Sequence, residues 1–252
     1  MGKVVFNRVS KIYRGARDVT ALEDISLSID EGEFVALLGP SGCGKSTLLN
    51  LLAGFEVATR GSLLFDGKPV RHPGPDRGVV FQEASLFPWL NVWENVVFGP
   101  RVQGLARAEF EDHAHELLKL VGLDAFADAL PVQLSGGMRQ RVGIARVLVM
   151  SPRALLMDEP FGALDAQTRL AMQQLLLDVW QSLGTTVLFV THDIDEAILL
   201  SDRVCIMSAR PGRIVRTMAI RLPRPRSIAN LTSPEFMAYK ADIMADIRVG
   251  AH

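Results

Sequence analysis

The sequence has few cysteines, little net charge and no long apolar run. Two cysteines among 252 residues, Cys43 and Cys205, cannot build a disulfide framework, which is consistent with a reducing compartment. A net charge of −1 gives no basic excess that would indicate nucleic acid. No segment approaches the roughly 18 apolar residues that span a bilayer, and the N-terminus lacks the apolar segment of a signal peptide. We therefore expect a chain that is soluble by itself and reaches any membrane through a partner.

Short apolar runs indicate strands in both halves of the chain. The first 35 residues alternate such runs with turns, which predicts antiparallel strands, and "GSLLFDGKPV" predicts a hairpin that turns at Asp66-Gly67. "FVALLG", "RGVVFQ", "RALLMDEP" and "TVLFVTHD" are typical of buried strands. "RVCIMSA" and "GRIVRTMAI" predict a closing hairpin. Strands that alternate with helices around a glycine-rich loop favour an α/β fold with a parallel sheet.

Helical periodicity marks three regions of the sequence. The segment from about residue 84 to 151 is mostly helical, and a second helix separates the last two buried strands. A third helix is predicted from Pro234. The apolar stripe of the first region is Phe110, Ala114, Leu117, Leu118 and Val121. The stripe of the second helix is Leu164, Ala171, Leu175, Val179 and Leu183.

A glycine-rich segment follows the first buried strand and precedes a helical run that ends at Gly54. "GPSGCGKST" matches G-x-x-x-x-G-K-[ST], the pattern of phosphate loops, in the strand-to-helix context that the pattern requires. The glycines let the backbone wrap a phosphate with its N–H groups. Lys45 should reach the β- and γ-phosphates, and the Ser46 hydroxyl should ligate Mg²⁺. The predicted nucleotide-binding residues are Gly39, Pro40, Ser41, Gly42, Cys43, Gly44, Lys45, Ser46 and Thr47.

Acidic and polar residues follow the later buried strands. "LLMDEP" places Asp158 at a strand end, where it can hold the water shell of Mg²⁺. Glu159 stands beside it, where a carboxylate can polarise an attacking water. His192 follows "LFVT" at the same expected edge of the sheet and can donate a hydrogen bond to a γ-phosphate, although a lone histidine is more often structural.

Three further features leave alternatives open. Gln82 ends a strand, so its amide either ligates Mg²⁺ and orients water or is an ordinary polar residue leaving a strand. Tyr13 either stacks on an adenine or belongs to the core or surface. "SLFPWLNVW" fits an exposed apolar groove and ordinary core equally well. "LSGGMRQR" at residues 134–141 is a second helix start, and therefore a second anion site distant in sequence from the phosphate loop.

Taken in chain order, these segments resemble the ATP-binding cassette ATPase subunits over roughly residues 3 to 220. The resemblance rests on Tyr13, the phosphate loop, Gln82, "LSGG", "LLMDEP", "GALD" and His192. "HPGPDRGVVFQEASLFPWLNVWENVVFG", "DEPFGALDAQTR" and "VTHDIDEAILLSDRV" narrow it to bacterial importer ATPases of the nitrate, sulfonate and taurine branch. Met138 stands where the family usually has Gln, which leaves Ser135 and the backbone amides unchanged.

The resemblance implies how the nucleotide and its metal are held. Tyr13 would stack on adenine, while Lys45, Ser46 and the loop amides would hold the phosphates of ATP and Mg²⁺. Asp158 would support Mg²⁺, and Gln82 would sense Mg²⁺ and water.

The resemblance also implies the catalytic and partner contacts. Glu159 would be the general base, His192 would contact the γ-phosphate, and Asp165 would contact a second copy of the chain. ATP bound to that second copy would meet the signature residues Leu134, Ser135, Gly136, Gly137 and Met138.

The implied fold is α/β: a phosphate-loop (RecA-like) NTPase core with an N-terminal antiparallel β subdomain and an inserted helical subdomain. We expect an ATPase domain over residues 1–222, with the helical insertion at about 84–151, and a tail over 223–252 without an assigned role. The implied function is ATP hydrolysis for a bacterial importer, at the cytoplasmic face of the inner membrane. Its partners would be a second copy, permease subunits and, indirectly, a solute-binding protein, while sulfonate, taurine, nitrate and a pyrimidine precursor remain open as solutes.

Two other functions compete with import. A cassette ATPase that clamps nucleic acid or ribosomes is disfavoured by the single cassette, the absence of a coiled-coil insertion and the net charge of −1. A nucleotide-binding module without turnover is disfavoured by Glu159 and His192.

Overall fold

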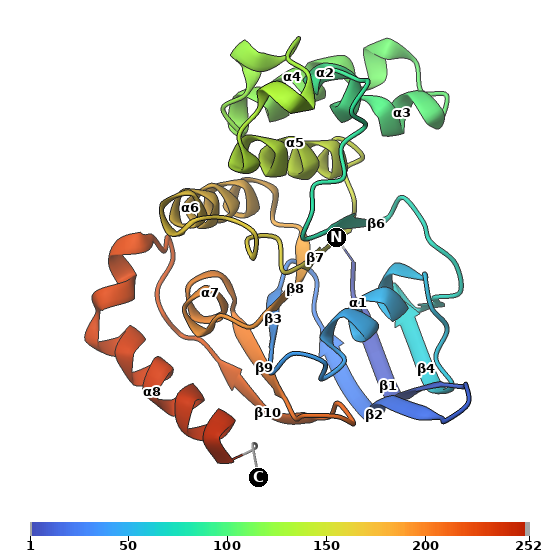
Figure 1. Ribbon diagram of the computed structural model, residues 1–252, viewed down its shortest axis with the longest axis vertical. Helices are drawn as coiled ribbons and strands as arrows, with labels where there is room; N and C mark the ends of the chain where they lie inside the picture. The colour runs from blue at the N-terminus through green and yellow to red at the C-terminus, as the bar shows by residue number, and fades with distance from the viewer. Residues whose placement is uncertain (1, 250–252) are drawn as a thin grey trace.

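The computed structural model describes residues 2–249, and two sheets organise it (Figure 1). Residue 1 and residues 250–252, at the ends of the predicted domain and tail, lie outside the described residues. The first sheet is antiparallel with the order β2-β1-β4-β5. Its strands are β1 (Val4–Tyr13), β2 (Val19–Ile29), β4 (Arg60–Phe65) and β5 (Lys68–Pro69). Asp66 and Gly67 both have positive φ between β4 and β5, so the predicted hairpin turn is confirmed.

The second sheet has the order β10-β9-β3-β8-β7-β6 and is parallel except for β10. Its strands are β3 (Phe34–Leu38), β6 (Arg77–Val80), β7 (Ala154–Asp158), β8 (Thr186–Thr191), β9 (Arg203–Met207) and β10 (Ile214–Ala219). The central strand β3 is buried on both faces, as its apolar sequence predicted. Phe34 and Ala36 enter one hydrophobic core, whereas Val35 and Leu37 enter the other. The predicted α/β fold class is confirmed.

Three helices follow strands of this sheet. They are α1 (Lys45–Ala53), α6 (Ala166–Leu183) and α7 (Ile194–Leu200). Helix α1 ends at Gly54, which has a left-handed conformation and caps the last turn, as predicted. Asp165 and Asp193 accept backbone N–H bonds at the starts of α6 and α7, so side-chain caps fix both helix starts.

The buried face of α6 differs from the predicted stripe. Leu164 precedes the helix, and Ala171 and Leu183 are exposed. Of the predicted positions only Val179 is fully buried, and the face that packs inward carries Met172, Gln173, Leu176, Leu177 and Val179. Apolar residues occupy neighbouring positions from 170 to 177, so periodicity alone does not decide which side of the helix faces the core.

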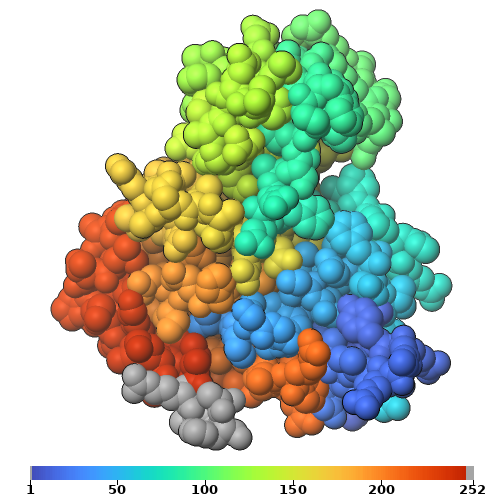
Figure 2. All heavy atoms as spheres, in the orientation of Figure 1, coloured from blue at the N-terminus to red at the C-terminus, as the bar shows by residue number. Residues whose placement is uncertain are grey.

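A helical lobe lies between β6 and β7, and stands apart at the top of the molecule (Figures 1 and 2). Its elements are α2 (Val92–Val96), α3 (Phe98–Val102), η1 (Arg107–Glu109), α4 (Glu111–Leu120), η2 (Asp124–Phe126), η3 (Pro131–Gln133) and α5 (Gly136–Leu148). All five residues of the predicted stripe around α4 are buried. The lobe is therefore helical, as its periodicity predicted, and its apolar residues belong to the same hydrophobic cluster as one face of the central sheet.

The C-terminal segment packs along the core through η4 (Ile228–Thr232) and α8 (Pro234–Val249). Phe236 is fully buried in the same apolar cluster as the central sheet. The Arg226 side chain is 2% exposed and donates to carbonyl oxygens of Ile198, Leu199, Ser201, Ile220 and Leu222. Burial lowers the pKa of Arg226 to about 10, so it stays charged at neutral pH. This segment is thus fixed to the end of α7. Within residues 2–249, no helix combines the length and apolar composition needed to cross a membrane.

Candidate active site

The glycine-rich loop joins β3 to α1 in a conformation that only its glycines tolerate. Gly42 and Gly44 have φ values of 75° and 97°. A Cβ on Gly44 would lie 2.7 Å from Leu22 Cδ2 and 2.9 Å from the Ala21 carbonyl oxygen. The Cys43 side chain is buried, which raises the pKa of its thiol. The loop is thus packed tightly against β2, with its concave side facing a pocket.

That pocket has a volume of about 250 Å³ and receives side chains from five segments. Its lining residues are Tyr13, Val19, Ala21, Ser41, Gly42, Gly44, Lys45, Ser46, Thr47, Glu159 and Arg210. The Lys45 Nζ atom donates to the carbonyl oxygens of Gly39 and Pro40 at 2.8 and 3.1 Å, and lies 4.0 Å from Glu159 Oε1. The ring of Tyr13 is 39% exposed at the far end, so it is available to a flat ligand.

Two oxygen ligands suited to Mg²⁺ converge beside Lys45. Ser46 Oγ donates to Asp158 Oδ1 at 3.0 Å. Burial raises the pKa of Asp158, and the hydrogen bond from Ser46 opposes that rise. Among residues 2–249, no cluster of three His, Cys, Asp or Glu side chains could hold a metal ion. A hydroxyl and a carboxylate next to a phosphate pocket fit Mg²⁺, which usually takes one or two protein ligands and fills its shell with water and phosphate oxygens.

Glu159 and His192 are brought together by adjacent parallel strands. The Glu159 backbone N–H donates to the Val190 carbonyl oxygen at 2.9 Å, and His192 Nδ1 lies 3.0 Å from Glu159 Oε2. Glu159 has a φ of 45°, which is strained for a residue with a side chain. The His192 side chain is 59% exposed. A carboxylate and an imidazole therefore face the same open edge of the sheet, next to Lys45.

Gln82 lies near the turn that follows Glu159. Its Nε2 atom lies 3.1 Å from the point that a Cβ on Gly162 would occupy, and the Glu159 carbonyl oxygen lies 3.5 Å from the same point. Its role toward Mg²⁺ and water stays a prediction.

The signature residues form a separate site at the start of α5. Ser135 caps the helix, and its Oγ accepts the Met138 backbone N–H at 3.3 Å. A second pocket, of about 420 Å³, is lined here by Gly122, Leu123, Phe126, Ser135, Gly137, Met138, Arg141, Gln167, Thr168 and Ala171. None of these residues lines the pocket of the phosphate loop. The chain therefore holds two distinct candidate anion sites.

Asp165 stands between these two sites. Its carboxylate caps α6 by accepting the Thr168 backbone N–H at 3.0 Å, and that hydrogen bonding lowers the pKa of Asp165. Thr168 also packs on the signature, because its Cγ2 lies 2.5 Å from the point that a Cβ on Gly137 would occupy. Only glycine lets α5 and α6 approach this closely. Asp165 itself is exposed and free to contact another molecule.

Sequence reasoning missed polar residues that support or line the site. Glu196 is 4% exposed and accepts hydrogen bonds from Thr191 Oγ1 at 2.6 Å and from Gln173 Nε2 at 3.1 Å. It thereby joins α6 and α7 beneath His192. Arg210 reaches the pocket from the turn between β9 and β10. The apolar runs that end at Thr191 and before Ser208 identify the buried strands that precede these two residues. No periodicity in the sequence distinguishes Glu196 or Arg210 from charged residues exposed to solvent.

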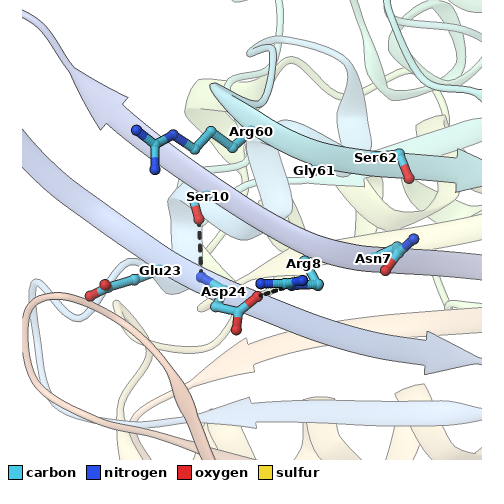
Figure 3. Close-up of a pocket in the computed structure, with 8 residues that line it drawn as sticks. All are labelled: Asn7, Arg8, Ser10, Glu23, Asp24, Arg60, Gly61 and Ser62. Atoms are coloured by element: carbon cyan, nitrogen blue, oxygen red, sulfur yellow. Dashed lines mark hydrogen bonds and ion pairs between the residues drawn. The ribbon is translucent and has the colours of Figure 1, made fainter.

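A larger hollow, of about 550 Å³, lies on the antiparallel sheet (Figure 3). Arg8 and Asp24 have positive φ at a register shift between β1 and β2, and their side chains form an ion pair at 3.2 Å. Glu23 pairs with Arg213 at 2.7 Å. Arg60 also lines the hollow, so its lining carries charges of both signs.

Known proteins are similar to this chain over most of its length. The family described as "ABC transporter" matches residues 22–162, which include the phosphate loop, Asp158 and Glu159. The chain is 53% identical to a taurine import ATP-binding protein, TauB, of Burkholderia pseudomallei, over 89% of this chain and 86% of that protein. It is 47% identical to a nitrate import ATP-binding protein, NrtD, of Synechocystis, over 95% and 93%. A dimeric post-hydrolysis structure of the ATP-binding cassette MJ0796, bound to ADP and Pi, matches with a TM-score of 0.75 at 35% identity, over 87% and 100%.

Proposed function

The chain belongs to the ABC transporter family, and from this premise we propose that it energises the uptake of a small solute such as taurine, a sulfonate or nitrate. It is the ATP-hydrolysing subunit of an importer. The observation that carries the proposal is one pocket lined by Lys45, Ser46 and Glu159, to which hydrogen bonds with Ser46 and Glu159 join Asp158 and His192. We propose that residues 1–222 form the ATPase domain and that residues 223–252 form its tail.

The pocket is built to hold a nucleoside triphosphate. Backbone N–H groups at the start of α1 point toward the phosphates, where the helix dipole favours negative charge. Lys45 exchanges its bonds to loop carbonyls for phosphate oxygens. Tyr13 offers its exposed face to the adenine. Ser46 and Asp158 would hold Mg²⁺, which when bound would supply positive charge to neutralise the phosphates.

Glu159 is the general base in this proposal. Its carboxylate lies at the open strand edge, where it can accept a proton from a water molecule attacking the terminal phosphate. The hydrogen bond with His192 fixes the direction of that carboxylate. The imidazole, largely exposed, then orients toward the γ-phosphate. The strained φ of Glu159 supports this assignment, because such strain persists where a side chain must be held in one place.

Two copies of the chain form a homodimer, as the dimeric relative supports. We propose that each copy offers its signature pocket to the nucleotide held by the other copy. The two pockets of one chain share no lining residue, which supports this arrangement. The signature pocket would then bind the phosphate of a nucleotide that the other copy holds. A two-fold axis would complete both sites at once, with Asp165 and Gln82 near the contact.

The permease is the third element of the proposal. An apolar groove of about 460 Å³ lies between the sheet and the helical lobe, and includes Phe81, Phe87, Phe98 and Met150. The residues of "SLFPWLNVW" divide between the two predicted environments. Phe87 lines the groove, whereas Val92 is buried in the core. We propose that a permease helix docks here and holds the chain at the cytoplasmic face of the inner membrane, with a solute-binding protein on the other side. Co-purification with a multi-span membrane protein tests this step.

The clamp on nucleic acid or ribosomes is not favoured. Relatives at about half identity are named as import proteins, and they cover nearly the whole chain. Co-purification of the chain with ribosomes or DNA, and with no membrane protein, would reverse that preference.

Substitution Glu159→Gln tests the proposed reaction. The amide keeps the size of the side chain but cannot accept the proton, so turnover should fall at least about 100-fold while ATP binding persists. Steady-state phosphate release and equilibrium ATP binding are the measurements. Glu31→Gln, an exposed acid in the turn before β3, is the matched control and should keep wild-type turnover. Normal turnover in Glu159→Gln would remove Glu159 from the role of base.

A further inference from the structure

Arg210 is a charged residue of the nucleotide pocket to which neither the sequence motifs nor the proposed function gives a role. It lies in the turn that joins β9 to β10, more than 160 residues after the phosphate loop. It nevertheless lines the same pocket as Tyr13, Ser41 and Lys45. The Nη2 atom of its guanidinium lies 3.8 Å from the point that a Cβ on Gly42 would occupy. The guanidinium therefore borders the phosphate loop itself.

The backbone of this turn is fixed to both the phosphate loop and β2. The Gly212 N–H donates to the Ala21 carbonyl oxygen at 2.9 Å, and the Glu23 N–H donates to the Gly212 carbonyl oxygen at 3.0 Å. A Cβ on Gly212 would lie 2.0 Å from the Cys43 carbonyl oxygen, so only glycine allows this approach. The turn is therefore held against the pocket wall. Arg210 lies two residues before Gly212, so its backbone has a fixed position beside the pocket.

Internal hydrogen bonds stiffen the same turn. Ser208 Oγ donates to the Pro211 carbonyl oxygen at 3.0 Å and accepts the Arg213 N–H at 3.0 Å. The Ser208 N–H donates to the Arg213 carbonyl oxygen at 2.9 Å. A rigid support lowers the entropy that a side chain loses when it binds a ligand.

The guanidinium of Arg210 is available to a ligand. Across residues 2–249 it makes no hydrogen bond or ion pair, whereas Arg213 in the same turn is paired with Glu23 at 2.7 Å. Lys45 and Arg210 are the two cations that line the pocket, and Lys45 Nζ is enclosed by loop carbonyls. An unpaired guanidinium beside a phosphate-binding loop matches the geometry of a phosphate oxygen, which arginine binds through its planar fork.

We propose that Arg210 is a nucleotide-binding residue whose guanidinium pairs with a phosphate oxygen of ATP or ADP from the side of the phosphate loop opposite Lys45. This inference rests on the proposed function, because it needs the nucleotide in this pocket. It adds a contact that comes from the β9–β10 turn, which packs on the loop at Gly212 and is hydrogen-bonded to β2.

The test is calorimetric titration of the full chain with ADP, which gives affinity without turnover. Arg210→Ala should weaken ADP binding about tenfold, the usual size of one lost hydrogen bond to a charged group. Arg210→Lys keeps the charge but not the planar fork, and should recover only part of that loss. Arg213→Ala is the matched control: it removes an arginine from the same turn but outside the pocket, and should bind ADP within about twofold of wild type. Thermal unfolding of each variant checks that it is folded.

Lys45→Ala separates failure of this inference from failure of the proposed function. Loss of ADP binding in Lys45→Ala with wild-type affinity in Arg210→Ala would overturn the Arg210 contact and leave the proposed function intact. Unchanged affinity in Lys45→Ala would place the nucleotide elsewhere and overturn both.

Discussion

Met138 follows the two glycines of the signature, and its surroundings explain how a thioether is accommodated there. The side chain is half-buried and packs against the main apolar cluster. It lines the signature pocket together with Leu123 and Phe126. Its backbone N–H, and not its side chain, donates to Ser135 Oγ. The anion-binding part of the signature therefore does not depend on which side chain follows the glycines.

Substitution Met138→Gln should be tolerated. The two side chains have similar length, and the amide can turn toward the open pocket, so the free energy of unfolding should fall by less than about 1.5 kcal/mol. Turnover should stay within about threefold of wild type. Urea unfolding and steady-state ATPase activity are the measurements. Met157→Gln, fully buried in β7, is the contrast and should cost several kcal/mol. A collapse of turnover in a stable Met138→Gln chain would give the thioether a direct role.

At the scale of elements, α6 and α7 are joined by polar contacts beneath the active site. Glu196 on α7 accepts hydrogen bonds from Gln173 on α6 and from Thr191 at the end of β8. Asp193 on the following turn lies 4.0 Å from Arg169 of α6. Asp165 caps α6, and His192 precedes α7. Asp165 and His192 are therefore attached to the same pair of helices, α6 and α7.

Glu196 should make stability depend on pH. Burial raises its pKa, so between its ordinary pKa and the raised one the folded chain keeps a proton that the unfolded chain releases. Rising pH through that window therefore lowers the stability of the wild type. Glu196→Gln can keep both hydrogen bonds if Gln173 turns its amide, and it removes the titration. From pH 5 to pH 7 its free energy of unfolding should decline less than that of the wild type.

Urea unfolding across that pH range is the measurement, and Glu116→Gln, an exposed acid on α4, is the matched control. Its pH profile should parallel that of the wild type. Parallel profiles for Glu196→Gln and the wild type would show that Glu196 does not titrate differently in the two states.

The sequence predicted those parts of the fold and site that depend on strand ends. Lys45, Asp158 and His192 each follow a buried apolar strand, and parallel strands bring their carboxyl ends to one edge. The inward face of α6 could not be predicted, because apolar residues surround that helix. Arg210 could not be predicted either, because its place depends on hydrogen bonds between Gly212 and β2, which leave no pattern in the sequence.

At the scale of the whole molecule, one chain has two separate candidate sites for phosphate groups. The phosphate-loop pocket contains Lys45, and the signature pocket contains Ser135, and their lining residues do not overlap. A two-fold dimer would pair the Lys45 of each copy with the Ser135 of the other. If this is so, a defect at Ser135 and a defect at Lys45 in different chains should compensate for each other.

Mixing Ser135→Ala chains with Lys45→Ala chains tests this complementation. Each variant alone should lose most of its turnover, since every site of its homodimer lacks one group. In a mixed dimer one site has both groups and the other has neither, so random mixing should restore about a quarter of the wild-type sites. Single-turnover hydrolysis is the measurement, because it counts competent sites. Ser135→Ala alone should still bind ADP like the wild type. If hydrolysis is not restored on mixing, or if Ser135→Ala loses ADP affinity in the isolated chain, Ser135 acts on its own chain's nucleotide.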